Sequence, residues 1–186
     1  MLETIQTKLS ELATQAGADA THKFVPSATR VYGVRMPLLN ALAREYKAGG
    51  FALAEALWAS GAFEERILAA KLLEKVGRHD PARIIRLVTR WSAQIDNWAV
   101  CDALGMQGIK GIVKTHRPQI FNLSASMLTS RNPWRRRLAL VLIQYYTRDA
   151  KAKPAIMKHL RALEHDDEYY VQKAVAWIKR NFAKGR

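Results

Sequence analysis

One aspartate occupies a helical position where the sequence favours an apolar side chain. The segment DNWAVCDALG, residues 96–105, reads as the start of an amphipathic helix, and Asp102 follows Trp98 by one helical turn. Residues four apart share one face of a helix, so the indole ring and the carboxylate would reach the same place. A buried, ionised carboxylate must reach a binding face or lose its charge at considerable cost. Asp102 is therefore a candidate catalytic residue; the alternative is an aspartate hydrogen-bonded to a neighbouring helix end.

The other reactive residues show no recognisable catalytic or metal-binding pattern. Cys101 is next to Asp102, but no histidine is placed by a motif to activate it, so we interpret it as a buried thiol. The five histidines lack metal-ligand spacing. The sequence contains neither a glycine-rich phosphate loop nor a serine-nucleophile motif. The residues therefore predict chemistry without a metal or another cofactor.

The charge of the chain predicts a polyanionic partner. Thirty Lys and Arg against 16 Asp and Glu give a net charge of +14. Residues 1–100 hold 13 basic and 10 acidic residues (+3), whereas residues 101–186 hold 17 and 6 (+11). A basic half of this kind is typical of nucleic-acid binding, where each neutralised phosphate releases counterions. A basic protein without such a partner is the plainer alternative, and membrane-surface binding is disfavoured because the basic residues are spread over several helices.

Length and composition predict one globular domain over residues 1–186. Apolar residues make up 49% of the chain, and the single cysteine allows no internal disulfide, which favours a reducing compartment. The N-terminus carries Glu3 and lacks the long apolar core of a signal peptide. No run approaches the roughly 18 apolar residues of a membrane span. We therefore expect a soluble, cytoplasmic and monomeric protein that has no contact with a membrane.

The elements that must position Asp102 are helices, and they recur. Apolar patterns of period 3.6 dominate and no convincing alternating strand is found, which predicts an all-α fold. Asp80 as N-cap and Pro81 at the first helical position mark one helix start. Helix-opening prolines occur at positions 81, 118 and 154, and an aromatic residue lies near the start of the following helix at positions 63, 98, 134 and 170. Such spacings are typical of HEAT-like repeats, and we predict a curved solenoid of antiparallel helix pairs.

The repeat isolates Asp102. Four residues after each marker aromatic the copies carry Ile67, Asp102, Leu138 and Ala174. Three of these are apolar, as a buried position repeated through a stack should be. A local pattern that fails at one point only is a reasonable indication of a functional site. Asp96, by contrast, precedes the helix and needs no role beyond that of N-cap.

Around these positions the chain resembles the AlkD-type DNA alkylation-repair glycosylases, a family built of HEAT-like helical repeats. The resemblance rests on four segments that occur in the right order: YGVRMPLLN (32–40), WAVCD (98–102), NPWRRRLAL (132–140) and YYVQKAVAWIKR (169–180). The family often has a second tryptophan and an acidic residue near its catalytic aspartate, where this chain has Asn97 and Ala99.

The resemblance implies roles for the matching residues. Asp102 would be the catalytic aspartate, Trp98 and Trp177 would contact the lesion, and Arg137 would contact DNA. Further DNA contacts are predicted at Arg136, Arg66 and Lys173, and candidates for an N-terminal aromatic contact are Phe24 and Tyr32. The plainer alternatives are that the tryptophans anchor the core and that the arginine run 135–137 is a solvated surface.

The resemblance also implies a reaction: hydrolysis of the N-glycosidic bond of N3- or N7-alkylated purines in double-stranded DNA, without base flipping. Alkylation makes the base cationic, so it departs neutral and needs no general acid. One carboxylate can then stabilise the oxocarbenium-like sugar and position a water, whereas ordinary glycosidases need two carboxyl groups. Two rival functions remain: a non-catalytic helical-repeat module that binds nucleic acid, and a protein-binding solenoid, which explains the position of Asp102 poorly.

Overall fold

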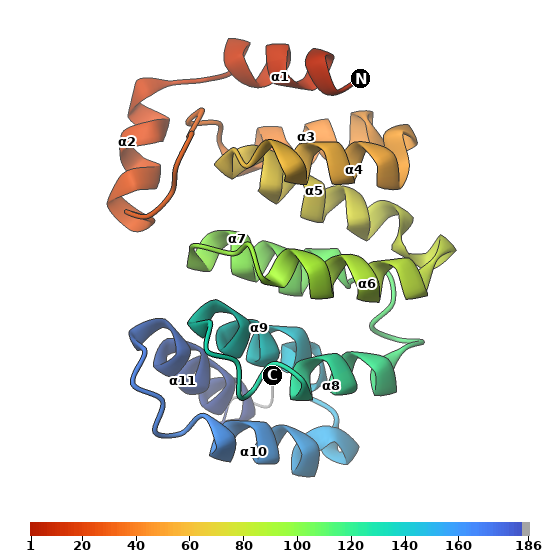
Figure 1. The fold of residues 1–186 in the computed structure, drawn as a ribbon, viewed down its shortest axis with the longest axis vertical. Helices are drawn as coiled ribbons and strands as arrows, with labels where there is room; N and C mark the ends of the chain where they lie inside the picture. The colour runs from red at the N-terminus through yellow and green to blue at the C-terminus, as the bar shows by residue number, and fades with distance from the viewer. Residues whose placement is uncertain (184–186) are drawn as a thin grey trace.

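The computed structural model describes residues 1–183, and in this part of the chain all regular structure is helical (Figure 1). The α-helices are α1 (Leu2–Glu11), α2 (Gln15–Phe24), α3 (Met36–Glu45), α4 (Gly50–Ser60), α5 (Phe63–Val76), α6 (Pro81–Ser92), α7 (Trp98–Ala103), α8 (Arg117–Ala125), α9 (Pro133–Ile143), α10 (Lys153–Ala162) and α11 (Tyr169–Ala183). The predicted all-α class is confirmed.

Short irregular helical segments connect or extend these helices. Four 3-10 segments are η1 (Lys47–Gly49), η2 (Gly77–His79), η4 (Gln144–Tyr146) and η5 (Ala150–Ala152). A π-helical segment, η3 (Leu104–Gly108), continues α7 without a break. π-helical turns inside α-helices occur frequently at functional sites. Here the π turn begins two residues after Asp102.

The helix starts follow the local sequence signals, with one exception. Proline occupies the first or second position of α6, α8 and α10, and the Asp80 carboxylate accepts the Arg83 N–H at the start of α6. The prediction that Asp96 caps the next helix was wrong. Asn97 is the N-cap of α7, since its side-chain oxygen accepts the Val100 N–H at 2.9 Å. Asp96 instead pairs with Arg66 at 3.2 Å.

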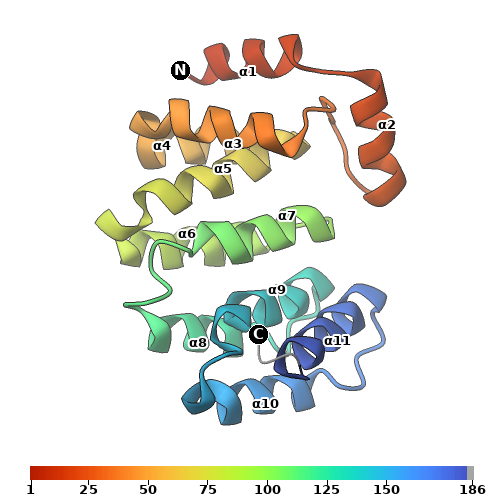
Figure 2. The same ribbon diagram turned by 180° about the vertical axis from the view of Figure 1, so that it is seen from behind.

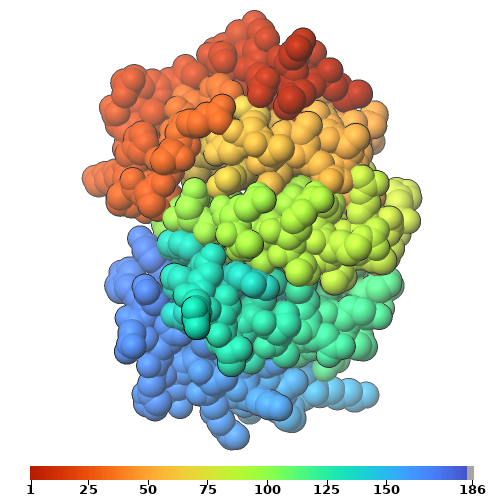
Figure 3. Space-filling model, in the orientation of Figure 1, coloured from red at the N-terminus to blue at the C-terminus, as the bar shows by residue number. Residues whose placement is uncertain are grey.

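The helices stack in chain order from one end of the molecule to the other, in two rows (Figures 1 and 2). In one row α3 packs on α5, α5 on α7, α7 on α9 and α9 on α11. We call this row the cleft row, because helices of this row line the cleft and the adjoining hollow described below. The other row, α4, α6, α8 and α10, covers its outer side, with α4 on α5 and α8 on α9. Figure 3 shows the successive layers in close contact along the outer side.

The apolar members of the predicted repeat series are buried in the core. The buried apolar side chains form a continuous cluster that extends from Ile5 to Ile178. Ile67, Leu138 and Ala174, which are equivalent positions in the cleft row, are buried in it. Asp102, the fourth member of the series, is the exception, and its side chain retains 23% exposure. The one polar residue of the series therefore lies at the boundary between the core and the surface.

Gly105 allows η3 to approach α9 closely. A Cβ at this position would lie 2.7 Å from the Val141 Cγ1 and 2.8 Å from the Leu138 Cδ1, which is closer than packed carbon atoms come. Both neighbours are completely buried, so they have little room to move. The absence of a side chain at Gly105 thus brings the helix that carries Asp102 against α9.

Candidate active site

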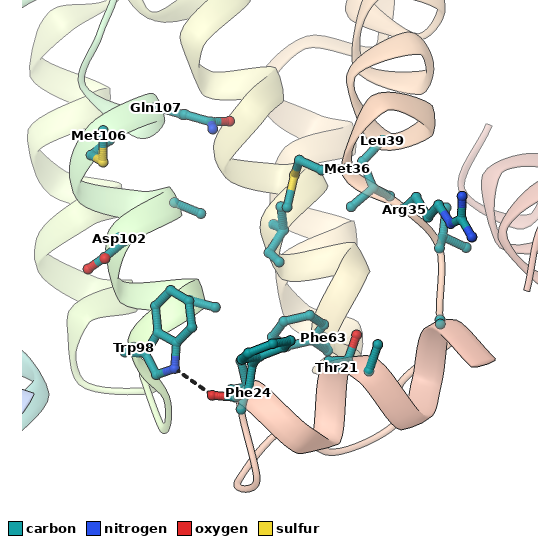
Figure 4. Close-up of a pocket in the computed structure, with 18 of the residues that line it drawn as sticks. Thr21, Phe24, Arg35, Met36, Leu39, Phe63, Trp98, Asp102, Met106 and Gln107 are labelled. Atoms are coloured by element: carbon teal, nitrogen blue, oxygen red, sulfur yellow. Dashed lines mark hydrogen bonds between the residues drawn. The ribbon is translucent and has the colours of Figure 1, made fainter. Parts of the chain in front are cut away.

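A cleft of about 620 Å³ lies between α2 and the cleft row. Its walls come from α2, the extended segment 33–35 and the helices α3, α5 and α7, and they are mostly apolar (Figure 4). Among the lining residues, Asp102 is the one acid and Arg35 the one base. Asp102 lies at the edge of the cleft with its carboxylate directed away from Phe24 and Met36.

Two aromatic residues from distant parts of the sequence meet at one end of this cleft. The Trp98 indole N–H, at the start of α7, donates a hydrogen bond of 3.0 Å to the Phe24 carbonyl oxygen, at the end of α2 (Figure 4). Phe24 is 68% exposed, so its ring is available for contact with a ligand. Both residues line the cleft together with Asp102. The aromatic end and Asp102 therefore border the same cleft.

Of the two N-terminal aromatic candidates, the structure brings only Phe24 to the cleft. The Tyr32 hydroxyl donates to the Glu65 carboxylate at 2.8 Å, and its backbone N–H donates to Glu64 at 3.0 Å. Burial, together with the hydrogen bond to Glu65, raises the pKa of Tyr32 to about 12. Tyr32 is therefore part of the packing between the N-terminal segment and α5.

The same network and one tight backbone contact hold α2 in place. The Glu64 carboxylate accepts the N–H groups of Gly33 at 2.7 Å and Val34 at 3.2 Å, and Glu64 is buried. Gly33 has a φ of 81°, and a Cβ on the facing Gly17 would lie 2.0 Å from the Gly33 carbonyl oxygen. Only glycine at both positions allows α2 to lie this close to the segment. The position of Phe24 at the end of α2 depends on this contact.

Asp102 is held by an arginine of the next helix in the cleft row. Arg137 Nε donates to Asp102 Oδ1 at 2.9 Å, and its Nη2 donates to Oδ2 at 2.8 Å. This is the bidentate geometry of strong arginine–carboxylate pairs. The third donor, Arg137 Nη1, contacts the Tyr170 carbonyl oxygen at 2.6 Å. One guanidinium therefore connects α7, α9 and α11.

Burial changes the acidity of this pair. Burial raises the pKa of Asp102, and the hydrogen bonds and charge of Arg137 offset only part of this effect. For Arg137, burial acts to lower the pKa, but the hydrogen-bonded Asp102 carboxylate outweighs it, so the pKa is raised and the guanidinium keeps its charge. Each carboxylate oxygen accepts one N–H from Arg137 and retains another lone pair. Asp102 can thus act on a further group while it stays paired.

The neighbouring cysteine is a buried thiol. The Cys101 side chain is fully buried, and its Sγ lies 3.5 Å from the Trp134 carbonyl oxygen. Burial raises the pKa of the Cys101 thiol well above its usual range. A thiolate is the reactive form of cysteine, so the interpretation of Cys101 as an inert, buried thiol is supported.

The arginines predicted to contact DNA all make contacts within the protein. Arg66 binds Asp96 and the Gln94 carbonyl oxygen, and lies over the Trp58 ring. Arg136 Nε and Nη2 hold both carboxylate oxygens of Asp166, at 2.6 and 3.0 Å. Arg137 likewise binds Asp102, so each of these three guanidinium groups connects neighbouring layers of the stack. Contacts between these arginines and DNA stay predictions. They would use the N–H groups that are not engaged within the protein.

The last two predicted site residues lie on α11, away from the cleft. Lys173 is exposed, and its ammonium lies 5.1 Å from the centre of the Tyr169 ring. Trp177 is partly buried against the core and is not among the residues that line the cleft. The structure therefore brings Trp98 and Asp102 together, adds Arg137 to them, and places Trp177 on a separate part of the cleft row.

Sequence reasoning missed Arg35 and Met36 as members of the cleft wall. Both lie within the segment 32–40, which carries part of the family resemblance. The resemblance marked this segment but assigned no role to either residue. Within residues 1–183, no three His, Cys, Asp or Glu side chains come close enough together to hold a metal ion. No helix in the same range is long and apolar enough to cross a membrane.

The fold and the site define an all-α protein with one arginine-held aspartate at the edge of an aromatic cleft. The sequence profile of a family described as DNA alkylation repair enzyme matches residues 5–186. The chain belongs to this family, which confirms the resemblance, and its members are enzymes that act in the repair of alkylated DNA. A comparison with curated proteins finds no match.

Proposed function

We propose that the protein is a DNA glycosylase that releases N3- or N7-alkylated purines from duplex DNA. The observation that carries this proposal is the single carboxylate at the edge of a mostly apolar cleft, fixed by two hydrogen bonds from Arg137. A cationic base departs as a neutral molecule, so one anion opposite the sugar is the main catalytic requirement. We further propose that the stacked rows form one HEAT-like solenoid domain over residues 1–186, with the cleft row on the face that meets DNA.

Asp102 would act on the sugar and on water. As the bond between C1′ and the purine nitrogen breaks, its electron pair stays with the base, and positive charge develops on the deoxyribose. The Asp102 carboxylate stabilises that charge in a site of low dielectric constant. A water then adds its oxygen to C1′ and gives its proton to Asp102. The products are a free neutral base and an abasic site, and no step requires a metal ion.

The aromatic residues would recognise the charge of the lesion. Trp98 lies one helical turn before Asp102, and Phe24 faces it from α2. Aromatic faces attract cations, by roughly 0.5–2 kcal/mol for each contact. An alkylated purine is a cation and an undamaged purine is not, so these rings favour the substrate. We propose that the enzyme acts on the base without flipping it, with Trp177 and Lys173 along the DNA beside α11.

The decisive test compares wild-type protein with Asp102→Asn in base release from methylated duplex DNA under single-turnover conditions. The substitution keeps the shape and removes the negative charge, so we expect a rate loss of about 10²–10³-fold, by analogy with single oxyanion-hole donors. Binding to damaged DNA should persist. Wild-type protein without base release, or a variant with an undiminished rate, would contradict the proposal and favour the alternative of a non-catalytic DNA-binding module.

The melting temperature belongs to the same experiment. From the sequence alone, loss of a partly buried charge predicts unchanged or higher stability. The structure changes this expectation, because Asp102→Asn leaves the Arg137 guanidinium, only 9% exposed, without its counter-charge. We expect a loss of about 1–2 kcal/mol, since the amide oxygen still accepts a hydrogen bond. The variant should remain folded, so a large rate loss cannot be attributed to unfolding.

A further inference from the structure

A second hollow of about 310 Å³ adjoins the active-site cleft on the cleft row. Met106 and Gln107 line both spaces, so the two are neighbours along the same face. Their chemistry differs. The cleft is apolar with one acid, whereas the hollow is lined by four basic side chains and one carboxylate: Arg44, Lys71, Lys75, Lys110 and Glu74.

Lys71 is the most unusual member of this group. It is only 3% exposed, and its ammonium donates to the Asn40 side-chain oxygen at 2.6 Å. Among the described residues, no carboxylate lies within ion-pair distance of it; Glu74 is shared by Lys75 at 3.4 Å and Lys110 at 2.9 Å. Burial lowers the pKa of Lys71, which reflects the cost of a desolvated charge. Buried charges are normally paired, so this ammonium lacks a partner that the hollow has room to admit.

We infer that the hollow around Lys71, Lys75 and Lys110 binds a phosphate of the DNA backbone, away from the alkylated nucleotide. The choice of DNA as the ligand rests on the proposed function. Lysine is a common phosphate ligand that acts as a point charge, and three lysines with Arg44 exceed the charge of Glu74. Basic side chains are the largest group in the wall of the hollow, whereas the wall of the cleft is mostly apolar and contains one basic residue, Arg35.

The spacing supports a contact that is separate from the lesion. Lys110 follows Asp102 by eight residues and lies in the turn just after η3, which corresponds to roughly 12 Å at the helical rise of about 1.5 Å per residue. Successive nucleotides of one strand advance about 3.4 Å along the duplex axis. A phosphate held in the hollow would therefore belong to a nucleotide other than the alkylated one. Such a contact fixes the position of the duplex on the cleft row and carries no sequence information.

The test measures binding to a short undamaged duplex over a series of salt concentrations. The variants are Lys71→Met, which keeps an apolar stem in the core, and Lys110→Gln, which changes an exposed residue. The matched control is Lys158→Gln, which removes one exposed positive charge from α10 in the outer row. We expect each hollow variant to bind roughly three- to tenfold more weakly at low salt, with the slope of log K against log salt reduced by about 0.9. The control should match wild type.

The inference is wrong if both hollow variants keep the wild-type affinity and salt slope. Should Lys71→Met fail to fold, Lys110→Gln and Arg44→Gln carry the same test from exposed positions. Inorganic phosphate supplies a second arm: if it raises the melting temperature of wild type but not of Lys71→Met, while duplex binding is unchanged, the hollow binds a small anion and not DNA. The two proposals can also be separated. If the hollow variants bind duplex more weakly but the wild-type protein releases no base, phosphate binding in the hollow is supported and the glycosylase activity is rejected.

Discussion

The ion pair between Asp102 and Arg137 gives the active-site carboxylate a fixed orientation and an altered acidity. Arg137 directs both carboxylate oxygens through two hydrogen bonds and is itself anchored to the Tyr170 carbonyl oxygen. Arg137, which was predicted to contact DNA, therefore positions Asp102, the proposed catalytic aspartate. Its one remaining route to DNA is through the donors that these three bonds leave unused.

The pH dependence of base release should report the acidity of Asp102. Only the ionised carboxylate stabilises the sugar cation, so activity should fall as pH falls through the pKa of Asp102. Burial raises this pKa, and we expect the acid limb above the ordinary aspartate value of about 3.9. The measurement is single-turnover base release against pH, with spontaneous depurination subtracted. An acid limb at or below the ordinary value would contradict this assignment.

Arg137→Ala should move that acid limb to higher pH. The positive charge of Arg137 acts to lower the pKa of Asp102, so its removal leaves burial unopposed and raises the pKa further. The rate at neutral pH should fall as well, because the carboxylate loses the two hydrogen bonds that orient it. The matched control is Arg136→Ala, which breaks an equally close pair, with Asp166, on the same helix. Arg136→Ala should lower the stability and leave the acid limb at the same pH. If both variants shift the acid limb equally, the shift is a general structural effect and not a property of the Asp102–Arg137 pair.

At the scale of the element, α7 and η3 bring the site together by lying unusually close to α9. The π turn follows directly after the residues that carry Trp98 and Asp102, and Gly105 within it contacts the buried Leu138 and Val141. Arg137 is on the same helix as those two residues. The distance between α7 and α9 thus determines whether guanidinium and carboxylate meet.

Gly105→Ala should therefore damage both stability and activity. The new methyl group would lie 2.7 Å from the Val141 Cγ1, and such overpacking costs about 1–3 kcal/mol, partly offset by the better helix propensity of alanine. We expect a net loss of about 1–2 kcal/mol in urea unfolding, and a lower rate of base release in the folded protein. The control is Gly108→Ala in the same segment, whose nearest neighbour would be the Leu104 Cδ1 at 3.2 Å. Equal effects from both substitutions would contradict the role given to Gly105.

At the scale of the molecule, two surfaces of different chemistry lie along one face of the stack. The apolar cleft with Asp102 lies between α2 and the cleft row, and the basic hollow lies beside it. The net charge of +14 favours DNA in general, and among the described residues this face combines the basic hollow with the proposed catalytic carboxylate. Long-range attraction and local chemistry are therefore carried by different residues.

Binding to undamaged duplex should be weak, independent of sequence and steeply dependent on salt. The described basic residues offer point charges for phosphates, and nonspecific contacts of this kind carry no base readout. Competition between unrelated duplexes, repeated at several ionic strengths, measures both properties. An affinity that does not change with salt, or a strong preference for one sequence, would count against a backbone-directed DNA enzyme.

Local signals were sufficient for the helices and for the exceptional aspartate. Proline at the start of α6, α8 and α10 restricts the backbone before any tertiary contact forms, so these starts could be predicted. The repeat pointed to Asp102 because it places that carboxylate among positions that are otherwise apolar. The cap at Asn97 was missed because Asp96 is an equally good cap by residue type, and only the backbone path decides between them.

The partners of Asp102 were decided by the tertiary structure alone. Asp102 and Arg137 are 35 residues apart, and their contact exists because Gly105 lets two helices pack closely. Phe24 reaches the cleft because Gly17 and Gly33 hold α2 across the end of the stack. A sequence pattern reports which side of its own helix a residue occupies. It contains no measure of how two helices approach each other, and that approach determines which charges pair, which are buried and what chemistry remains possible.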